Sequence, residues 1–163
     1  MIPNENTSLH DVYLALGSNI GDRENNLESA IRQINDRIGK TITVSSFYTT
    51  QPVGFESKNS FLNAACYVQS ALSPLQILDE TQAIEKELGR IKKSVNQSYS
   101  DRTIDIDILL YDNLTVEYPR LLIPHPHMHT RDFVLLPLAQ IAPNIIHPVL
   151  NKTILELQKD MQI

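Results

Sequence analysis

The sequence has little cysteine, little glycine and no tryptophan. Its 163 residues include five glycines and one cysteine, Cys66. A single cysteine cannot form a disulfide within the chain, which is typical of a reducing compartment. Cys66 lies in the apolar run FLNAACYV, where a small core side chain is the expected role. A disulfide-rich secreted domain is therefore excluded, and we expect a cytoplasmic location.

Long apolar runs are also missing. No stretch reaches the ~18 residues of a transmembrane helix, so no membrane partner is expected. The N-terminus, MIPNENTSLH, lacks the basic start and apolar segment of a secretory signal. We expect residues 1–10 to form a disordered extension. Because no repeat, low-complexity segment or linker divides the chain, residues 1–163 are predicted to form a single domain.

Charge is unevenly distributed along the chain. The net charge is −5, which disfavours nucleic acid as a partner. Residues 1–89 hold 6 basic and 11 acidic side chains, whereas residues 90–131 hold 6 basic and 5 acidic ones. A local gathering of cations on an acidic protein indicates a small anionic ligand.

The stretch DRTIDIDILLYDN, residues 101–113, carries the strongest chemical signal. Isoleucines alternate with Asp105 and Asp107, and a period of two is typical of a strand with one buried face. Both carboxylates then point the same way, with Cα atoms about 6.5 Å apart, which suits ligands of a divalent cation. The alternative is a strand whose solvent-facing side happens to be acidic. Aspartate is a poor strand residue and like charges repel, so the metal interpretation is favoured.

Cations flank this acidic pair in the sequence. They are Arg90, Lys92, Lys93, Arg102, Arg120 and Arg131. Two carboxylates among guanidinium and ammonium groups indicate a magnesium and polyphosphate site, because phosphoryl transfer depends on positioning and charge neutralisation.

Periodicity and turn residues predict the remaining elements. Asp22 and Ser73 are expected to cap two helices that end at Gly39 and Gly89, and Thr130 is expected to cap a third. Strands are predicted over residues 11–16, 42–50, 61–69, 104–110 and 114–118, residues 121–123 are apolar, and a closing helix is predicted over residues 151–163. This order fits an α+β fold with a ferredoxin-like core, in which an antiparallel sheet has helices packed on both sides as three α/β/α layers.

Three further segments are candidates for binding. Phe61 and Asn63 share one strand face, where a ring and an amide could bind a flat heterocycle, although Phe61 is equally compatible with an ordinary core role. The glycine-containing turn 17–22 could cradle phosphate, but ordinary turn chemistry is favoured. Residues 90–100 are polar and cationic and could fold over a ligand as a lid.

The histidines of PHPHMH and the polar face of the second helix allow two interpretations each. Alternating His125, His127 and His129 could bind zinc, but the intervening prolines favour hydrogen bonding to phosphate by one or two of them. Gln82 and Glu85 are most simply solvent-facing helix residues.

Several motifs together resemble one known family. RTIDIDILLYD, ALGSNIGD, SSFYTTQPVG, FLNAA and IPHPHMHTRDFVLLPLAQIAP occur in an order and at spacings similar to those of 6-hydroxymethyl-7,8-dihydropterin pyrophosphokinases, over about Val12 to Ile146. The resemblance implies transfer of pyrophosphate from the co-substrate ATP to the hydroxymethyl group of a reduced pterin, with release of AMP, in folate biosynthesis. It departs from the family at Lys92 and Tyr99, where arginine and tryptophan are often found.

The resemblance also implies roles for individual residues. Asp105 and Asp107 would bind two Mg²⁺ ions. Catalytic roles would fall to Arg90, Lys92, Arg102, Asp105 and Asp107. Pterin contacts would come from Thr50, Val53, Phe61, Asn63, Tyr99 and Phe133. ATP contacts would come from Gln82, Glu85, Arg90, Arg102, Ile108, Arg120, His125 and Arg131.

Two other function classes remain as alternatives. A ferredoxin-like sensor domain could hold a nucleotide without reacting it, but simple nucleotide binding does not need the acidic pair. An RNA-binding sheet is disfavoured by the negative net charge and the lack of paired exposed aromatics. No feature of the sequence requires self-association, so a monomer acting on small molecules is expected.

Overall fold

The computed structural model describes residues 8–50, 60–89 and 102–161. In chain order the elements are β1 His10–Ser18, α1 Arg23–Arg37, β2 Lys40–Val44, β3 Tyr48–Thr50, β4 Phe61–Ser70, α2 Pro74–Gly89, β5 Asp105–Tyr111, β6 Val116–Tyr118, β7 Leu121–Ile123, a 3₁₀ turn η2 Met128–Thr130, α3 Asp132–Ile141 and α4 Ile154–Asp160. His10, which the sequence analysis assigned to a disordered extension, is the first residue of β1.

The main sheet is antiparallel and holds five strands. Its order is β2-β4-β1-β5, and β3 also pairs with β4, beyond the end of β2. The hairpin β6-β7 forms a separate two-stranded sheet. β5 is therefore an edge strand, with one side free of strand partners in the main sheet.

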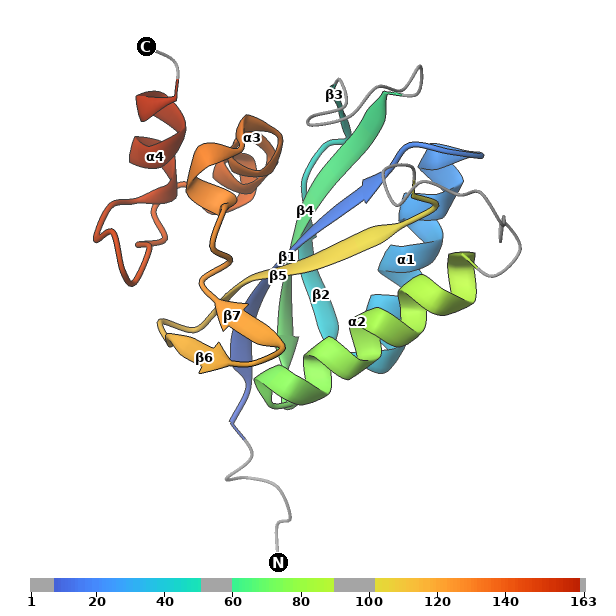
Figure 1. The fold of residues 1–163 in the computed structure, drawn as a ribbon, viewed down its shortest axis with the longest axis horizontal. Coiled ribbons are helices and arrows are strands. Elements are labelled where there is room, and N and C mark those ends of the chain that lie inside the picture. The colour runs from blue at the N-terminus through green and yellow to red at the C-terminus, as the bar shows by residue number, and fades with distance from the viewer. Residues whose placement is uncertain (1–7, 51–59, 90–101, 162–163) are drawn as a thin grey trace, which may run out of the picture.

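Helices cover both faces of this sheet, as Figure 1 shows. α1 and α2 pack Leu27, Ile34 and Ile84 against sheet residues that include Leu14 and Ile106. On the opposite face α3 and α4 pack their apolar side chains against Tyr13, Leu109 and Leu110. The predicted α+β fold, with an antiparallel sheet between two helical layers, is confirmed.

The predicted caps of the first two helices are confirmed. The Asp22 side chain accepts a hydrogen bond from the backbone N–H of Asn25. The Ser73 hydroxyl accepts from the backbone N–H of Gln76, whose side chain accepts from the backbone N–H of Ser73. This reciprocal pair is a capping box. Cys66 is fully buried, as its apolar surroundings predicted.

Three local predictions were wrong. The strand predicted over 42–50 is two strands, β2 and β3, with an interruption at residues 45–47. Thr130 does not cap α3: it ends η2, its hydroxyl donates to the carbonyl of His127, and Arg131 precedes the helix without a side-chain cap. The closing helix covers only Ile154–Asp160, because Thr153 forms a capping box there.

Gly39 follows the first helix as predicted, but for a different reason. A Cβ atom at this position would lie 2.1 Å from the backbone oxygen of Gln69 in β4. Close approach of two backbones requires this glycine, rather than a left-handed helix cap. None of the helices in the described ranges is long and apolar enough to cross a membrane.

Candidate active site

One face of the sheet brings the two predicted binding regions together. Gly17 in the middle of the sheet is paired with Asn63 on one side and Asp105 on the other. Ala15 is likewise paired with Ala65 and Asp107. Directly opposed residues of antiparallel strands project from the same face. Asn63, Asp105 and Asp107 therefore share the face that α3 covers, which confirms that both aspartates point the same way.

The aspartates are partly exposed and meet cationic side chains. Their side chains are 35% and 37% exposed, and Asp105 Oδ1 lies 3.3 Å from Arg102 Nη1. His125 Nε2 lies 3.9 Å from Asp107 Oδ2. Burial and the neighbouring charge of Asp105 raise the pKa of Asp107 to about 7, although Arg131 and Arg102 oppose the shift. Burial is the largest cause of this shift, so the two carboxylates lie side by side in a partly desolvated site.

Glu85 forms a third acidic group at this site. Its carboxylate accepts a hydrogen bond of 2.7 Å from the backbone N–H of Ile106, at the free edge of β5. Burial raises the pKa of Glu85 to about 7, the Ile106 hydrogen bond lowers it, and the charges of Asp105 and Asp107 raise it further. The interpretation of Glu85 as a solvated helix residue was wrong, because α2 lies against the β5 edge.

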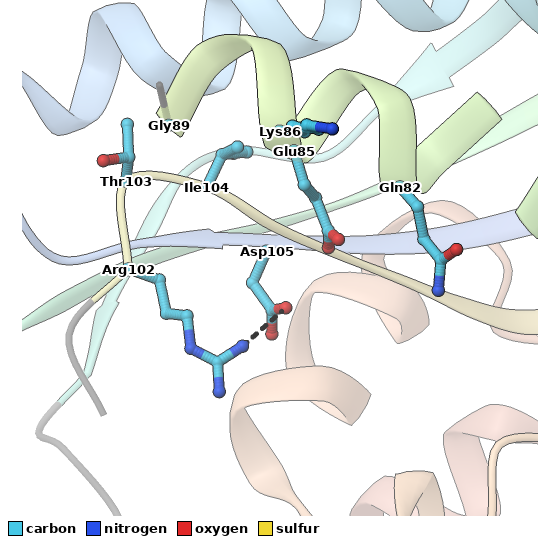
Figure 2. Close-up of a pocket in the computed structure, with 8 residues that line it drawn as sticks. All are labelled: Gln82, Glu85, Lys86, Gly89, Arg102, Thr103, Ile104 and Asp105. Carbon is cyan, nitrogen blue, oxygen red and sulfur yellow. Dashed lines mark hydrogen bonds and ion pairs between the residues drawn. The ribbon is translucent and has the colours of Figure 1, made fainter. Parts of the chain in front are cut away.

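A cavity of about 340 Å³ lies between α2 and the start of β5. Figure 2 shows its lining, with Gln82 and Glu85 on α2 and Arg102 beside Asp105. Lys86, Gly89, Thr103 and Ile104 complete the lining. The volume is in the range of small-molecule pockets. None of these four residues was predicted as a site residue, because only the packing of α2 beside β5 brings them to the cavity.

Arg120 joins the same region from the β6-β7 hairpin. Its Nη2 lies 2.6 Å from Asp79 Oδ1 and 3.5 Å from Gln82 Oε1, so it lies next to α2. Ile108 differs from the other predicted nucleotide contacts, because its side chain is buried among the core residues under α1 and α2. Only the backbone of Ile108 could therefore contact a ligand at the edge of β5.

The hydrogen bonds of His125 determine its tautomer. Its Nδ1 lies 3.1 Å from the backbone N–H of His127 and accepts from it. A neutral ring then carries its proton on Nε2, the atom facing Asp107. Burial, with the charges of Arg131 and His127, lowers the pKa of His125 to about 4. The ring is therefore neutral at pH 7 and can donate a hydrogen bond there.

The alternating histidines do not converge on one point. The His125 and His127 rings contact edge to face at 6.1 Å, but His129 lies instead beside His147 at 6.3 Å. Among residues 8–50, 60–89 and 102–161, no group of three or more His, Cys, Asp or Glu side chains has the arrangement of a metal site. The zinc interpretation is therefore not supported.

The second half of the site surrounds Asn63. Its Nδ2 donates to the Thr50 hydroxyl at 2.6 Å, which fixes the orientation of the amide. A Cβ atom on Gly17 would lie 3.0 Å from Asn63 Oδ1 and 3.5 Å from the Phe61 ring. Gly17, which the sequence analysis placed in a turn, lies in β1 and leaves room for both side chains.

Phe133 lies in the first turn of α3, on the same side of the sheet. The Arg131 guanidinium lies 5.7 Å from the centroid of its ring, within cation–π distance. Phe61 and Phe133 are both only partly buried, so neither is an ordinary core residue. Val53, Arg90, Lys92 and Tyr99, and the proposed lid at 90–100, lie outside the described residues.

The fold and the site together define a class of protein. It is an α+β protein in which an acidic pair, arginines and a neutral histidine lie at the edge of an antiparallel sheet, next to an amide and aromatic side chains.

Comparison with known proteins identifies the family. Residues 13–143 match the family model described as 7,8-dihydro-6-hydroxymethylpterin-pyrophosphokinase (HPPK). The 2-amino-4-hydroxy-6-hydroxymethyldihydropteridine pyrophosphokinase of Porphyromonas gingivalis is 51% identical over 138 residues, covering 84% of this chain and 93% of the relative. The enzyme of the same name from Bacillus subtilis is 45% identical over 134 residues, covering 82% and 78%. The chain therefore belongs to the HPPK family and is a pyrophosphokinase, a transferase.

Solved structures support the fold. Wild-type HPPK-DHPS of Plasmodium falciparum matches with a TM-score of 0.74 at 19% identity, covering 96% of this chain and 45% of that chain. An HPPK-DHPS in complex with substrates matches with a TM-score of 0.73 at 18% identity, covering 93% and 43%. The chain thus spans less than half of these longer proteins, and at this identity the likeness shows the fold.

Proposed function

We propose that the protein transfers pyrophosphate from ATP to 6-hydroxymethyl-7,8-dihydropterin, giving the pterin diphosphate and AMP, as a cytoplasmic monomer in folate biosynthesis. The main support for the proposal is that Asn63, Asp105 and Asp107 lie on the same face of the sheet. Asn63 and Asp105 lie on either side of Gly17, two strand positions apart, or about 10 Å between Cα atoms. A substrate bound at Asn63 can therefore meet a phosphate chain bound at the aspartates.

Asp105 and Asp107 fit the requirements of Mg²⁺. Their carboxylates are hard oxygen ligands on one face, and burial together with the neighbouring charge of Asp105 raises the pKa of Asp107, so a cation bound there would relieve the repulsion. Magnesium sites in phosphoryl-transfer enzymes combine one or two carboxylates with phosphate oxygens, so two protein ligands suffice. We propose that the pair holds two ions, which when bound neutralise the phosphates and increase the electrophilicity of the β-phosphorus.

The cationic side chains are proposed to hold ATP around this pair. Arg102 lies beside Asp105, and Arg131 lies close enough to lower the pKa of Asp107. His125 is neutral and presents its Nε2 proton toward Asp107, so it can donate to a phosphate oxygen. The nucleotide itself is proposed to occupy the cavity beside α2. Its contacts there would be Gln82, Glu85, Arg120 and the backbone of Ile108, with Arg90 as an additional predicted contact.

The pterin is proposed to lie between the rings of Phe61 and Phe133, with its polar edge at Asn63. Because Thr50 accepts from Asn63 Nδ2, Asn63 Oδ1 and the second amide proton are left for the ligand. This complementary donor and acceptor pair suits the edge of a flat heterocycle. Val53 and Tyr99 are additional predicted contacts.

The reaction does not require a strong general base on this chain. The pterin hydroxyl attacks the β-phosphorus and releases its proton to solvent, the bond from that phosphorus to the α-phosphate oxygen breaks, and AMP leaves. Arginines oriented toward the phosphates stabilise the transferred charge and hold the leaving group. Arg90 and Lys92 are proposed to contribute from the segment that follows α2.

Phosphorus NMR tests the proposed reaction. The protein is incubated with Mg²⁺, ATP and the reduced pterin, and the products are identified from their phosphorus signals. AMP and a pterin diphosphate support the proposal. ADP would indicate an ordinary kinase, and unchanged ATP with retained nucleotide binding would indicate the sensor alternative. A pterin with a methyl group in place of the hydroxymethyl group serves as the control and should give no AMP.

A further inference from the structure

The connection between β2 and β3 contains an extra residue. Val44 is paired with Cys66, and Tyr48 is paired with Asn63, both in β4. Three residues separate Val44 from Tyr48, but only two separate Cys66 from Asn63. Residues 45–47 therefore form a β-bulge against β4, immediately before the strand that carries Thr50.

Ser45 lies at the start of this bulge and is 5% exposed. Its backbone N–H donates to the carbonyl of Ala65, as in a regular antiparallel ladder. In a regular ladder the N–H of Ala65 would return a bond to the Ser45 carbonyl. Here the Ala65 N–H donates instead to the Ser45 hydroxyl, at 2.9 Å. The hydroxyl thus takes the place of its own carbonyl as the acceptor.

The same hydroxyl stabilises the bulged backbone. It donates to the carbonyl of Ser46 at 2.8 Å, so both its donor and its acceptor capacity are used. Without the hydroxyl, the buried Ala65 N–H would be left unpaired or would donate to the Ser45 carbonyl instead. A hydrogen bond to the Ser45 carbonyl would remove the bulge and restore regular pairing. The following strand would then be shifted by one residue relative to β4.

A shift of one residue reverses which side chains face the site. Tyr48 now lies on the α3 side, where its hydroxyl donates to Gln140 of α3 at 2.7 Å. In the shifted register Tyr48 would be opposite Leu62 and would turn away from α3, and Thr50 would leave Asn63. Thr49 would then be opposite Phe61. The threonine opposite Phe61 would then lie on a strand that no longer bonds to Gln140 of α3, so the support of the hydroxyl partner of Asn63 would be lost.

We propose that Ser45 is a positioning residue for the pterin: its hydroxyl holds the bulge that places Thr50 against Asn63. This inference rests on the proposed function, because it assigns Asn63 to the pterin. Ser45 acts through Thr50 and Asn63 and does not itself contact the ligand.

Ser70 provides a matched control in the same strand. It is 1% exposed, its hydroxyl donates to the carbonyl of Ile38 at 2.7 Å, and it accepts from the backbone N–H of Leu72 at 3.1 Å. Like Ser45 it is a buried serine with two bonds to backbone groups. It lies at the opposite end of β4 from Phe61 and Asn63. Loss of its hydroxyl should affect stability without affecting the pterin site.

The experiment measures KM for each substrate, kcat and the melting temperature in Ser45→Ala, Ser70→Ala and Ser45→Thr. We expect Ser45→Ala to raise the KM for the pterin at least fivefold while the KM for ATP changes less than twofold. Ser45→Ala and Ser70→Ala should lower the melting temperature by similar amounts, but Ser70→Ala should leave the pterin KM within twofold of wild type. Ser45→Thr retains the hydroxyl and should restore the pterin KM to within twofold.

Two results would overturn the inference. One is an unchanged pterin KM in Ser45→Ala, and the other is an equal rise in Ser45→Ala and Ser70→Ala. If Ser45→Ala does not fold, Ser45→Cys is measured against the same limits, because its thiol is only a weak hydrogen-bond partner. A failure of the proposed function is recognised separately, because the wild-type protein would then form no AMP from ATP and the pterin.

Discussion

At the scale of single residues, Asp105 and Asp107 are expected to support activity while they destabilise the folded protein at neutral pH. Asp105 and Asp107 project from one face, and burial together with the charge of Asp105 raises the pKa of Asp107 from 3.8 to about 7. A raised carboxylate pKa means that the folded protein holds a proton that the unfolded chain releases. Asp107 therefore makes its full contribution to the free energy of unfolding below about pH 4. This contribution is progressively lost as the pH rises through 7.

This conflict predicts opposite effects of Asp107→Asn on stability and activity. Without ligands at pH 8 the variant should melt at a higher temperature than wild type, whereas at pH 4 the two should melt alike. Turnover should fall at least 100-fold, because about 2.7 kcal/mol of transition-state stabilisation or more is lost. Asp36→Asn, at an exposed carboxylate of α1, is the control and should change neither property. Near-normal turnover, or a lower melting temperature at pH 8, would contradict the account.

Gly17 gives a second prediction at the residue scale. A methyl group there would lie 3.0 Å from Asn63 Oδ1 and displace the amide from the orientation that Thr50 holds. Gly17→Ala should weaken pterin binding about tenfold, equivalent to about 1.4 kcal/mol. Titration calorimetry with the pterin in the presence of an inert ATP analogue would measure this loss. Unchanged pterin affinity would show that Asn63 does not bind the ligand from this position.

At the scale of secondary structure, local signals predicted the elements well. The alternation of isoleucine and aspartate identified β5 and the shared direction of Asp105 and Asp107. Helical spacing and the capping residues Asp22 and Ser73 identified α1 and α2. These features depend on residues that are neighbours in the sequence, so a single sequence contains them.

Features that depend on distant partners were not predictable in this way. The break between β2 and β3 arises from the bond between Ser45 and Ala65, 20 positions apart. Glu85 has the sequence context of a solvent-facing helix residue, and only the packing of α2 beside Ile106 buries it. For the site, the residues alone indicated the acidic pair, the cations that flank it and a possible heterocycle contact, whereas the individual ATP and pterin contacts came from the family resemblance.

The glycines at element ends give a third prediction. Gly39→Ala should lower the free energy of unfolding by about 1–3 kcal/mol, because its Cβ would overlap the Gln69 carbonyl oxygen at 2.1 Å. Gly89→Ala is the matched substitution, since a Cβ there meets no atom within 4 Å. Alanine at the end of α2 should be neutral or stabilising by up to about 1 kcal/mol. Urea unfolding curves compare the two, and equal losses would contradict the steric explanation.

At the scale of the whole molecule, one sheet separates two cores. Cys66 is fully buried in the core under α1 and α2, and burial raises the pKa of its thiol to about 12. The folded protein should therefore react with a thiol reagent only through unfolding. We expect the rate of labelling to follow the unfolding equilibrium across a urea titration. Rapid labelling in the absence of urea would show that this core opens locally.

The whole fold also explains how separate segments form one site. β4 contributes Asn63, β5 contributes the acidic pair, and β1 between them contributes Gly17. α2 supplies Glu85 at the β5 edge, and Arg131 and Phe133 lie at the start of α3, above the same face. The sheet order is thus the reason why the proposed nucleotide site and the proposed pterin site lie side by side.

The central claim is that Asp105 and Asp107 bind the metal ions that hold the nucleotide. The most direct measurement is the affinity for a non-hydrolysable ATP analogue, by calorimetry with and without Mg²⁺, in wild type and in Asp105→Asn and Asp107→Asn. The account predicts that Mg²⁺ strengthens binding at least tenfold in wild type and less than twofold in either variant. An undiminished effect of Mg²⁺ in both variants would contradict it.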